Sequence, residues 1–369
     1  MREASTKLLV ELEPRSNVTD LLRQREAANP AHALYARKGP NGWTDVPAQK
    51  FLHDVCALAK GLIAGGLEPG DTVAVMSATR YEWALVDFAI WFAGGVSVPI
   101  DETSTPGQVE WILFDAGARR VFAQDRGKVL LITGILETST LLKDRLVTVV
   151  RMDNDGDAPN LASLSAAGMG VTDAELERHR SAAGLDDVAS LAYASGTTGR
   201  PKGCELTHGN FALVAVNVVA FLPEILKGQN TRTLMLLPLA NVLARAAQVA
   251  CLHAGATLGH VSRPADLRAD LGTFKPTFLL AVPRIFEKVR ADAAHQAAGS
   301  VRARIFAAAS AAAVRFSTAQ DTVARGGAAD PGWRCGPARR LRPAGVPEAP
   351  PAPWRPGPLR GIGGQPPGT

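Results

Sequence analysis

The sequence lacks the features that mark membrane-spanning and secreted proteins. It has no run of about 20 apolar residues, the length that crosses a bilayer. The best candidate, at residues 83–100, contains Asp87 and two adjacent glycines. The first 15 residues mix acidic and basic side chains and have no apolar core of the kind found in secretory signals. We therefore expect a cytoplasmic protein.

Cysteine is scarce, which argues against two further kinds of protein. There are four cysteines in 369 residues, widely separated and without a C-x-x-C pair. This spacing argues against a disulfide framework and a zinc site, and it fits a reducing cytosol. We assign no metal-ligating residue to the chain. The cysteines are Cys56, Cys204, Cys251 and Cys335.

The body of the chain has no excess of either charge, although the formal net charge is +5. Residues 331–369 contain six arginines and one glutamate, and residues 1–330 contain 34 basic and 34 acidic side chains. The tail has no aromatic side chains between its arginines apart from Trp333 and Trp354, so it does not resemble a surface that stacks on bases. We expect no nucleic-acid partner.

Hydrophobic residues make up 46% of the sequence, enough for a large core and for two or three domain-sized units. From about residue 70, short β-branched runs alternate with helical patterns of 10–15 residues. This alternation predicts an α/β fold with mostly parallel sheets flanked by helices. Strands are expected at residues 72–77, 96–100, 120–123, 146–150, 190–194, 234–237, 257–261 and 278–282. Helices are expected at 81–93, 106–116, 211–221, 265–274 and 301–325, and from 242 and 284.

The composition changes abruptly near residue 330. Residues 331–369 hold 11 prolines, 8 glycines and 6 arginines. One interpretation is a disordered proline-rich tail. The other, which we favour, is that a GC-rich gene is translated out of frame after about residue 330.

The segment YASGTTGRPKG, at residues 193–203, is the strongest functional signal. It follows an apolar strand and precedes a helix by a few residues. Its glycines allow close approach of a ligand, its hydroxyls and backbone N–H groups can donate hydrogen bonds, and Lys202 supplies positive charge. On composition alone, a flexible surface turn is an equal alternative. The order of residues excludes a Walker loop, a G-x-G-x-x-G fingerprint and a G-x-S-x-G elbow.

The ordered string closely resembles the AMP-binding signature of the adenylate-forming superfamily. In that family the loop binds the β- and γ-phosphates of ATP. The resemblance implies phosphate-binding roles for Ser195, Gly196, Thr197, Thr198, Gly199, Lys202 and Gly203. Among these, Thr198 and Lys202 are the expected catalytic residues.

Three further blocks, in family order, extend the resemblance to roughly residues 15–325. They are residues 70–100, 236–245 (LLPLANVLAR) and 275–289. The second is similar to a block of long-chain acyl-CoA synthetases and implies that Asn241 and Arg245 contact the substrate. The combination of blocks looks most like bacterial long-chain fatty-acid–CoA ligases of the actinobacterial kind. Asn241 stands where the family usually has histidine, and an amide cannot carry a proton. We interpret Glu82, Trp83 and Asp87, in the first block, as packing residues.

The resemblance implies that a carboxylate attacks ATP to give acyl-AMP, and that coenzyme A then takes the acyl group. The implied ligands are a fatty acid, ATP, Mg²⁺ and coenzyme A, with possible peripheral contact at the inner membrane face. Residues 290–369 contain no T-G-D, G-Y-G-x-T-E or G-R-x-K-x block. Residues 1–330 therefore resemble a partial adenylation domain without its C-terminal lid domain, and we expect the chain to lack ligase activity. Alternatives are a non-catalytic fragment or pseudoenzyme with residual nucleotide binding, and an adenylating enzyme for aromatic or amino acids.

Overall fold

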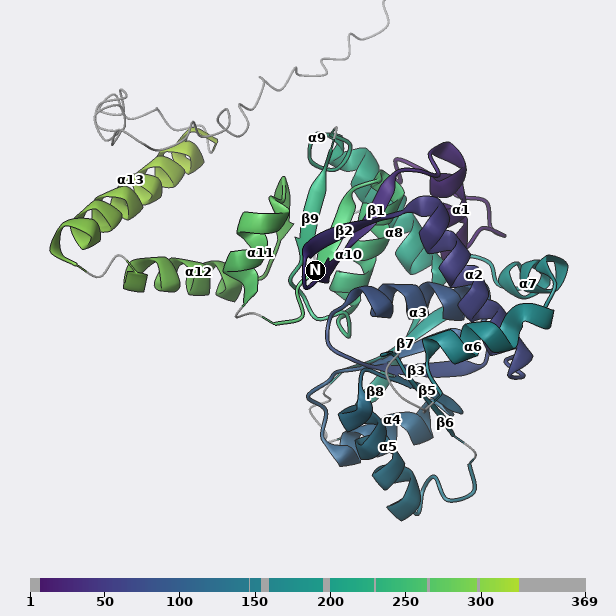
Figure 1. The fold of residues 1–369 in the computed structure, drawn as a ribbon. Coiled ribbons are helices and arrows are strands. Elements are labelled where there is room, and N and C mark those ends of the chain that lie inside the picture. The colour runs from purple at the N-terminus through teal and green to yellow at the C-terminus, as the bar shows by residue number, and fades with distance from the viewer. Residues whose placement is uncertain are drawn as a thin grey trace, which may run out of the picture. The chain divides into compact units, whose positions relative to one another are not determined.

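A computed structural model shows the architecture of the chain (Figure 1). It forms two compact units, residues 1–289 and 290–369. Among the described residues, no helix is both long enough and apolar enough to cross a membrane. The structure describes residues 7–145, 147–153, 159–194, 200–228, 230–263, 266–296 and 299–324.

The first unit contains a six-stranded sheet with the order β6-β5-β3-β4-β7-β8. Every neighbouring pair is parallel except β7 and β8, which are antiparallel. The predicted α/β fold with mostly parallel sheets is therefore confirmed. The strands are β3 (Thr72–Met76), β4 (Val96–Ile100), β5 (Arg120–Ala123), β6 (Thr148–Arg151), β7 (Val188–Ala194) and β8 (Lys202–Thr207).

A five-stranded sheet with the order β11-β9-β10-β1-β2 completes this unit. Only β1 and β2 are antiparallel. The predicted strand at 234–237 lies two residues earlier, so Leu236 and Leu237 follow its carboxyl end. The strands are β1 (Ala33–Gly39), β2 (Gly42–Pro47), β9 (Arg232–Met235), β10 (Thr257–His260) and β11 (Phe278–Leu280).

Helices cover both sheets. Those of the first unit are α1 (Val18–Ala28), α2 (Ala48–Ala64), α3 (Tyr81–Phe92), α4 (Pro106–Asp115), α5 (Arg126–Thr138), α6 (Leu161–Ala167), α7 (Asp173–Arg180), α8 (His208–Phe221), α9 (Pro223–Leu226), α10 (Val242–Ala254) and α11 (Leu267–Phe274), with a 3₁₀ turn at Gly168–Gly170. Helix α12 (Pro283–Gln296) crosses the unit boundary, and α13 (Ser300–Ala324) lies in the second unit. Most described side chains of α13 are exposed.

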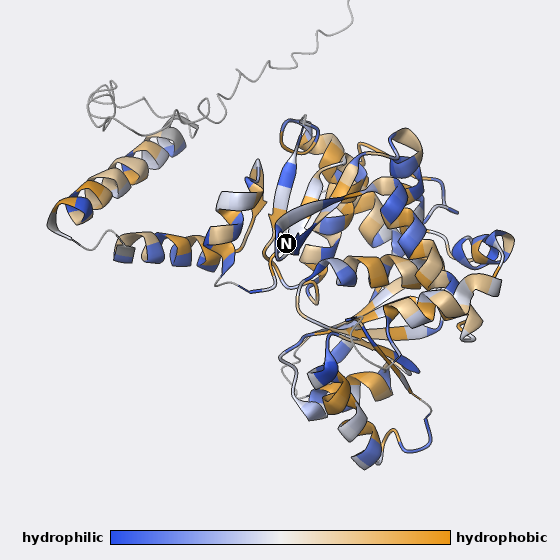
Figure 2. Ribbon diagram, viewed as in Figure 1, coloured by the Kyte–Doolittle hydropathy of each residue, from blue (hydrophilic) through white to orange (hydrophobic). Residues whose placement is uncertain are grey.

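Helix α3 explains the apolar stretch that the sequence places near residues 83–100. All 12 of its residues are buried, so it is a core helix and is hydrophobic on nearly every side (Figure 2). Strand β3 shows the matching two-residue period, because Val73 and Val75 face the α3 side while Ala74 and Met76 pack with α4 and α5. Helix α3 and helices α4 and α5 therefore cover opposite faces of the six-stranded sheet (Figure 1).

Candidate functional site

The glycine-rich segment sits between two paired strands. Strand β7 runs parallel to β4, with Ser190 opposite Ser97, so the carboxyl end of β7 lies at the carboxyl edge of the parallel strands. Ligands of open α/β sheets bind at that edge. Strand β8 returns antiparallel to β7 and pairs Ala194 with Lys202. The backbone on either side of the segment is therefore closed into a hairpin stem.

Two of the predicted phosphate-binding residues can be placed on this stem. Lys202 is the first residue of β8 and is exposed. Gly203 lies opposite Tyr193, and a Cβ atom at position 203 would be 3.1 Å from the Tyr193 ring. A side chain at 203 would crowd this ring, which is a structural reason for glycine there. The other predicted residues, Ser195, Gly196, Thr197, Thr198 and Gly199, lie outside the described residues, and their roles stay predictions.

Helix α4 contacts both strands of the stem. The Trp111 indole N–H donates to the Pro201 carbonyl at 2.9 Å, and the Arg200 guanidinium lies 4.4 Å from the centre of the Trp111 ring. The Tyr193 hydroxyl donates to Asp115 Oδ2 at 2.7 Å. Burial and this carboxylate raise the pKa of Tyr193, so the phenol keeps its proton. These contacts were not predicted, and the only sequence signal for them is the i, i+4 spacing of Trp111 and Asp115.

Asn241 caps helix α10. Its side-chain oxygen accepts a hydrogen bond from the Leu243 N–H at 2.9 Å, and the residue is exposed. Asparagine is among the best residues at this position because its oxygen satisfies a free backbone donor of the first turn. The departure from the family histidine therefore has a local structural role.

Arg245, one turn later in α10, points into the core. Its side chain is only 1% exposed and makes two hydrogen bonds to the Asp87 carboxylate, at 2.7 and 2.9 Å, and one to the Ser190 hydroxyl at 2.6 Å. The guanidinium also lies near the rings of Trp91 and Phe211, 5.3 and 5.2 Å from their centres. The predicted contact of Arg245 with substrate would have to displace these partners. The contacts of Asp87 agree with its interpretation as a packing residue.

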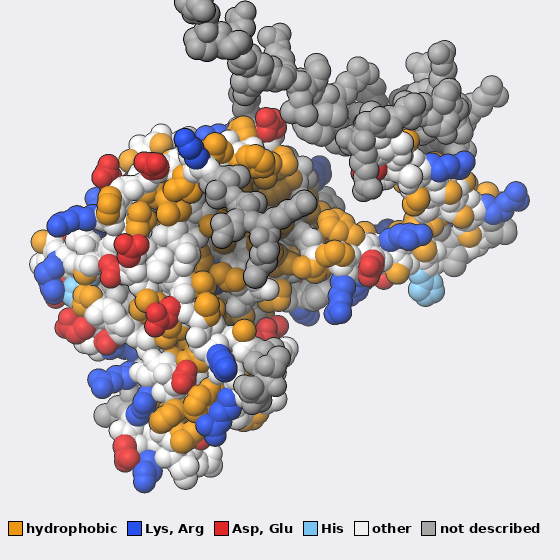
Figure 3. Space-filling view, turned by 180° about the vertical axis from the view of Figure 1, so that it is seen from behind, with side chains coloured by type: hydrophobic (Ala, Val, Ile, Leu, Met, Phe, Trp, Pro, Cys, Tyr) orange, Lys and Arg blue, Asp and Glu red, His pale blue; other side chains and the backbone are white. Residues whose placement is uncertain are grey.

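An apolar pocket of about 260 Å³ lies between helices α8, α9 and α10 and strands β9 and β11. Aliphatic chains suit such a lining because it offers contact without unpaired polar groups. Hydrophobic side chains also gather on the face of the first unit shown in Figure 3. The pocket is lined by Val218, Leu222, Ile225, Leu226, Thr233, Leu234, Met235, Ala247, Ala250, Cys251, Phe278, Leu279 and Leu280.

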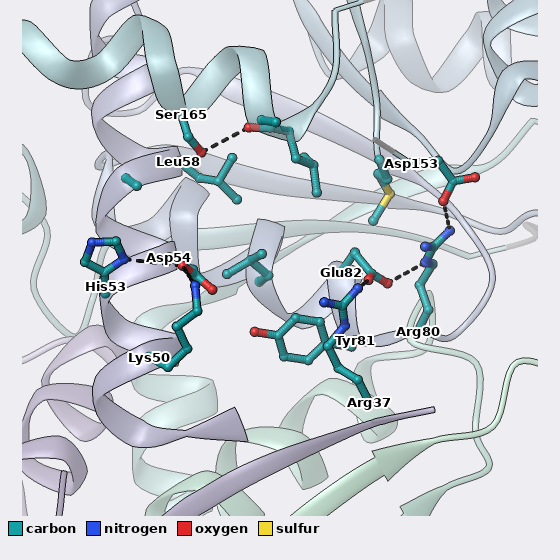
Figure 4. A pocket seen from close by; sticks show the side chains of 15 residues that line it. Arg37, Lys50, His53, Asp54, Leu58, Arg80, Tyr81, Glu82, Asp153 and Ser165 are labelled. Carbon is teal, nitrogen blue, oxygen red and sulfur yellow. Dashed lines mark hydrogen bonds and ion pairs between the residues drawn. The ribbon is translucent and has the colours of Figure 1, made fainter. Parts of the chain in front are cut away.

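A second cavity, of about 510 Å³, is lined by both charged and apolar side chains (Figure 4). Arg80 pairs with Glu82 at 2.6 Å and with Asp153 at 2.8 Å, and Arg37 pairs with Glu82 at 2.5 Å. Burial opposes ionisation of Glu82, but the two arginines outweigh it and lower the pKa of the carboxyl group. Lys50 likewise pairs with Asp54. Because these cations have acidic partners, we do not assign the phosphates of ATP to this cavity.

Two mostly parallel sheets share a core with the buried helix α3, and the paired strands β7 and β8 lie at a carboxyl edge, so the first unit is an α/β protein. The chain belongs to the AMP-binding enzyme family, whose model matches residues 22–328.

Two curated relatives show where in the family the similarity lies. The chain is 39% identical over 328 residues to the long-chain-fatty-acid–CoA ligase FadD15 of Mycobacterium tuberculosis, a match that covers 89% of this chain and 53% of the relative. It is 30% identical over 263 residues to the peroxisomal long chain acyl-CoA synthetase 7 of Arabidopsis thaliana, covering 68% of this chain and 36% of the relative. The chain thus spans about half the length of FadD15.

Solved structures support the fold. The inhibitor-bound N-terminal domain of FACL13 from Mycobacterium tuberculosis matches with a TM-score of 0.59 and 22% identity, covering 74% of this chain and 65% of that one. ATP-bound MatB from Rhodopseudomonas palustris matches with a TM-score of 0.60 and 23% identity, covering 74% and 51%. At this identity the likeness concerns the fold alone.

Proposed function

We propose that this chain is the nucleotide- and acyl-binding part of an AMP-forming long-chain fatty-acid–CoA ligase. The observation that carries the proposal is the β7–β8 stem, in which Lys202 pairs with Ala194 at the carboxyl edge of a mostly parallel sheet. The similarity to FadD15 supports the long-chain substrate class.

The proposed chemistry needs cations because it brings two anions together. A fatty-acid carboxylate attacks the α-phosphate of ATP, the bond to pyrophosphate breaks, and acyl-AMP forms. Lys202 and donors of residues 195–199 would bind the departing phosphates, where negative charge increases. The acyl group would then pass to coenzyme A with release of AMP.

We assign no metal ligand among the described residues. They contain no group of three or more His, Cys, Asp or Glu side chains that could hold a metal ion. We therefore derive no step through Mg²⁺ for this chain.

The apolar pocket is the proposed site of the acyl chain. Its α10 wall consists of Ala247, Ala250 and Cys251, which share one face of that helix. Val218 and Ile225 line the pocket and are also exposed, as is the nearby Phe221. This apolar rim supports peripheral contact with a lipid surface at the inner membrane face, from which a long-chain acid could enter.

Two assays separate ligase activity from nucleotide binding alone. Calorimetric titration with ATP tests binding, and palmitate-dependent exchange between ATP and labelled pyrophosphate tests adenylation. We expect ATP binding that Lys202→Met weakens, and no exchange. The matched control is Lys227→Met, another exposed lysine.

The outcomes lead to distinct conclusions. If the parent chain binds ATP without exchange, it is a nucleotide-binding fragment or pseudoenzyme of the ligase type. Exchange at rates typical of complete ligases would contradict the expected inactivity. Failure to bind ATP, or equal effects of Lys202→Met and Lys227→Met, would overturn the assignment of the phosphate site.

A further inference from the structure

Helix α4 is anchored in the core and lies beside an edge strand of the six-stranded sheet. Val109, Ile112 and Leu113 of α4 are buried in the core beneath the six-stranded sheet. The helix starts with Pro106 and a capping box between Thr105 and Gln108, which fixes its first turn. Strand β8, in contrast, is an edge strand of its sheet and, in the described part of the chain, pairs with β7 alone.

Two polar contacts join α4 to the hairpin stem, one to β7 and one to the residue that precedes β8. Asp115 binds Tyr193, which lies in β7, and Trp111 binds the carbonyl of Pro201, the residue immediately before Lys202. Pro201 has a fixed φ and lacks an N–H, so its carbonyl is its backbone hydrogen-bonding group. Trp111 therefore anchors the peptide unit that leads directly into Lys202.

The Arg200 guanidinium strengthens this anchor from the other side. It lies over the face of the Trp111 ring, an arrangement that attracts a cation to an aromatic ring. The indole thus uses its edge for the Pro201 carbonyl and its face for Arg200. Contact through two parts of one side chain restrains the orientation of the backbone as well as its position.

We propose that Trp111 and Asp115 are positioning residues for Lys202 in the binding of the polyphosphate chain of a nucleoside triphosphate. This inference rests on the proposed function. An exposed lysine on an edge strand loses conformational freedom when it binds phosphate, and holding its backbone in advance reduces that cost. Neither residue touches the nucleotide in this account, because both act through the stem.

The test is a double-mutant cycle on ATP affinity in the full chain. Trp111→Ala is expected to weaken ATP binding about tenfold, the size of a typical coupling between neighbouring residues. In a Lys202→Met background the same substitution should have little further effect, because the residue through which it acts is gone. Trp111→Phe, which retains the ring beneath Arg200, should restore part of the affinity.

Trp43→Ala is the matched control. Trp43 is also partly buried and also donates one indole hydrogen bond, to Thr273 Oγ1 at 3.1 Å, but it belongs to β2 of the other sheet. It should leave ATP affinity unchanged. Additive effects of Trp111→Ala and Lys202→Met, or an equal loss with Trp43→Ala, would overturn the proposal.

A measurement without nucleotide keeps this inference separate from the proposed function. Limited trypsin digestion at Lys202 reports how firmly the stem is held. Cleavage there should be about tenfold faster in Trp111→Ala and Asp115→Ala than in the parent or in Trp43→Ala. Losing the contact with α4 lowers the free energy of local unfolding of the stem, so trypsin reaches Lys202 more often. If the parent chain binds no ATP, the proposed function fails. Independently of that result, unchanged cleavage in Trp111→Ala and Asp115→Ala would show that α4 does not anchor the stem.

Discussion

The carboxylate of Asp87 and the guanidinium of Arg245 form a two-point ion pair inside the protein, although 158 positions separate them in the sequence. The two side chains are 0% and 1% exposed. Asp87 lies in α3 and Arg245 in α10, and Arg245 also binds Ser190 of β7. One buried cation therefore ties the central helix to the strand that leads into the glycine-rich segment.

Breaking this pair should destabilise the fold strongly. Arg245→Met is expected to lower the free energy of unfolding by about 3–5 kcal/mol, because it leaves a buried carboxylate without its cation. Urea denaturation measures the loss. The double variant Asp87→Leu/Arg245→Met should be more stable than Arg245→Met alone. A single variant as stable as the parent would contradict the burial of this pair.

The cap at Asn241 should contribute measurably to stability. Asn241→Ala removes the oxygen that accepts from Leu243 and is expected to cost about 1 kcal/mol. Asn241→Ser, which retains a capping oxygen, should cost less, and Asn241→His tests the residue usual in the family. Urea denaturation of the three variants gives the order of their free energies of unfolding. Equal stability of the alanine and serine variants would exclude the capping role.

Gly203→Ala should strain the hairpin stem. The new methyl group would meet the Tyr193 ring at 3.1 Å, and overpacking of this kind costs about 1–3 kcal/mol. The control is Gly134→Ala in α5, where no atom lies within 4 Å of the added carbon. That change should stabilise the helix by about 0.5–1 kcal/mol. If both changes stabilise, the stem can relax around Tyr193.

Two buried histidines predict a loss of stability in mild acid. Burial is the main cause that lowers the pKa of His208 and of His260 to about 4. The unfolded chain binds these protons near pH 6.5. Stability should therefore fall as pH decreases from about 6.5 to 4, because the unfolded state binds more protons in that range.

Each histidine should contribute about 1 kcal/mol per pH unit within this window. Urea denaturation at pH 7 and pH 5 tests the effect. His208→Gln and His260→Gln should each reduce the pH dependence, while the exposed His53→Gln serves as a control. An unchanged slope in both buried variants would show that these groups do not titrate in this way.

The sequence predicted the parallel strands after residue 70 well, because each is a short apolar run between helices of regular period. It did not predict β8, whose residues are mostly exposed and show no alternation. The β1–β2 hairpin was likewise not predicted from the sequence. Its turn has a recognisable signal, Asn41-Gly42, with φ of +108° at the glycine, but it lies before the region where strands and helices alternate clearly.

The candidate site was predicted less completely than the fold. A motif shows which residues recur together, and Arg245 stands in such a motif, but its partners Asp87 and Ser190 come from distant parts of the chain. The same limit applies to Trp111, whose contact with Pro201 spans 90 positions. Contacts of this kind depend on the tertiary arrangement, which periodicity in a sequence does not reveal.

The complete burial of α3 has a consequence for synthesis on the ribosome. The helix ends at Phe92. Strand β10, which pairs with β1 and contributes Leu258 to the core that contains α3, ends only at His260. At about 5–20 residues per second, the interval between them lasts on the order of 10–30 seconds. During that time a helix that is apolar on nearly every side lacks part of its cover. Nascent chains that stop in this interval should be strong substrates for chaperones that bind exposed hydrophobic segments.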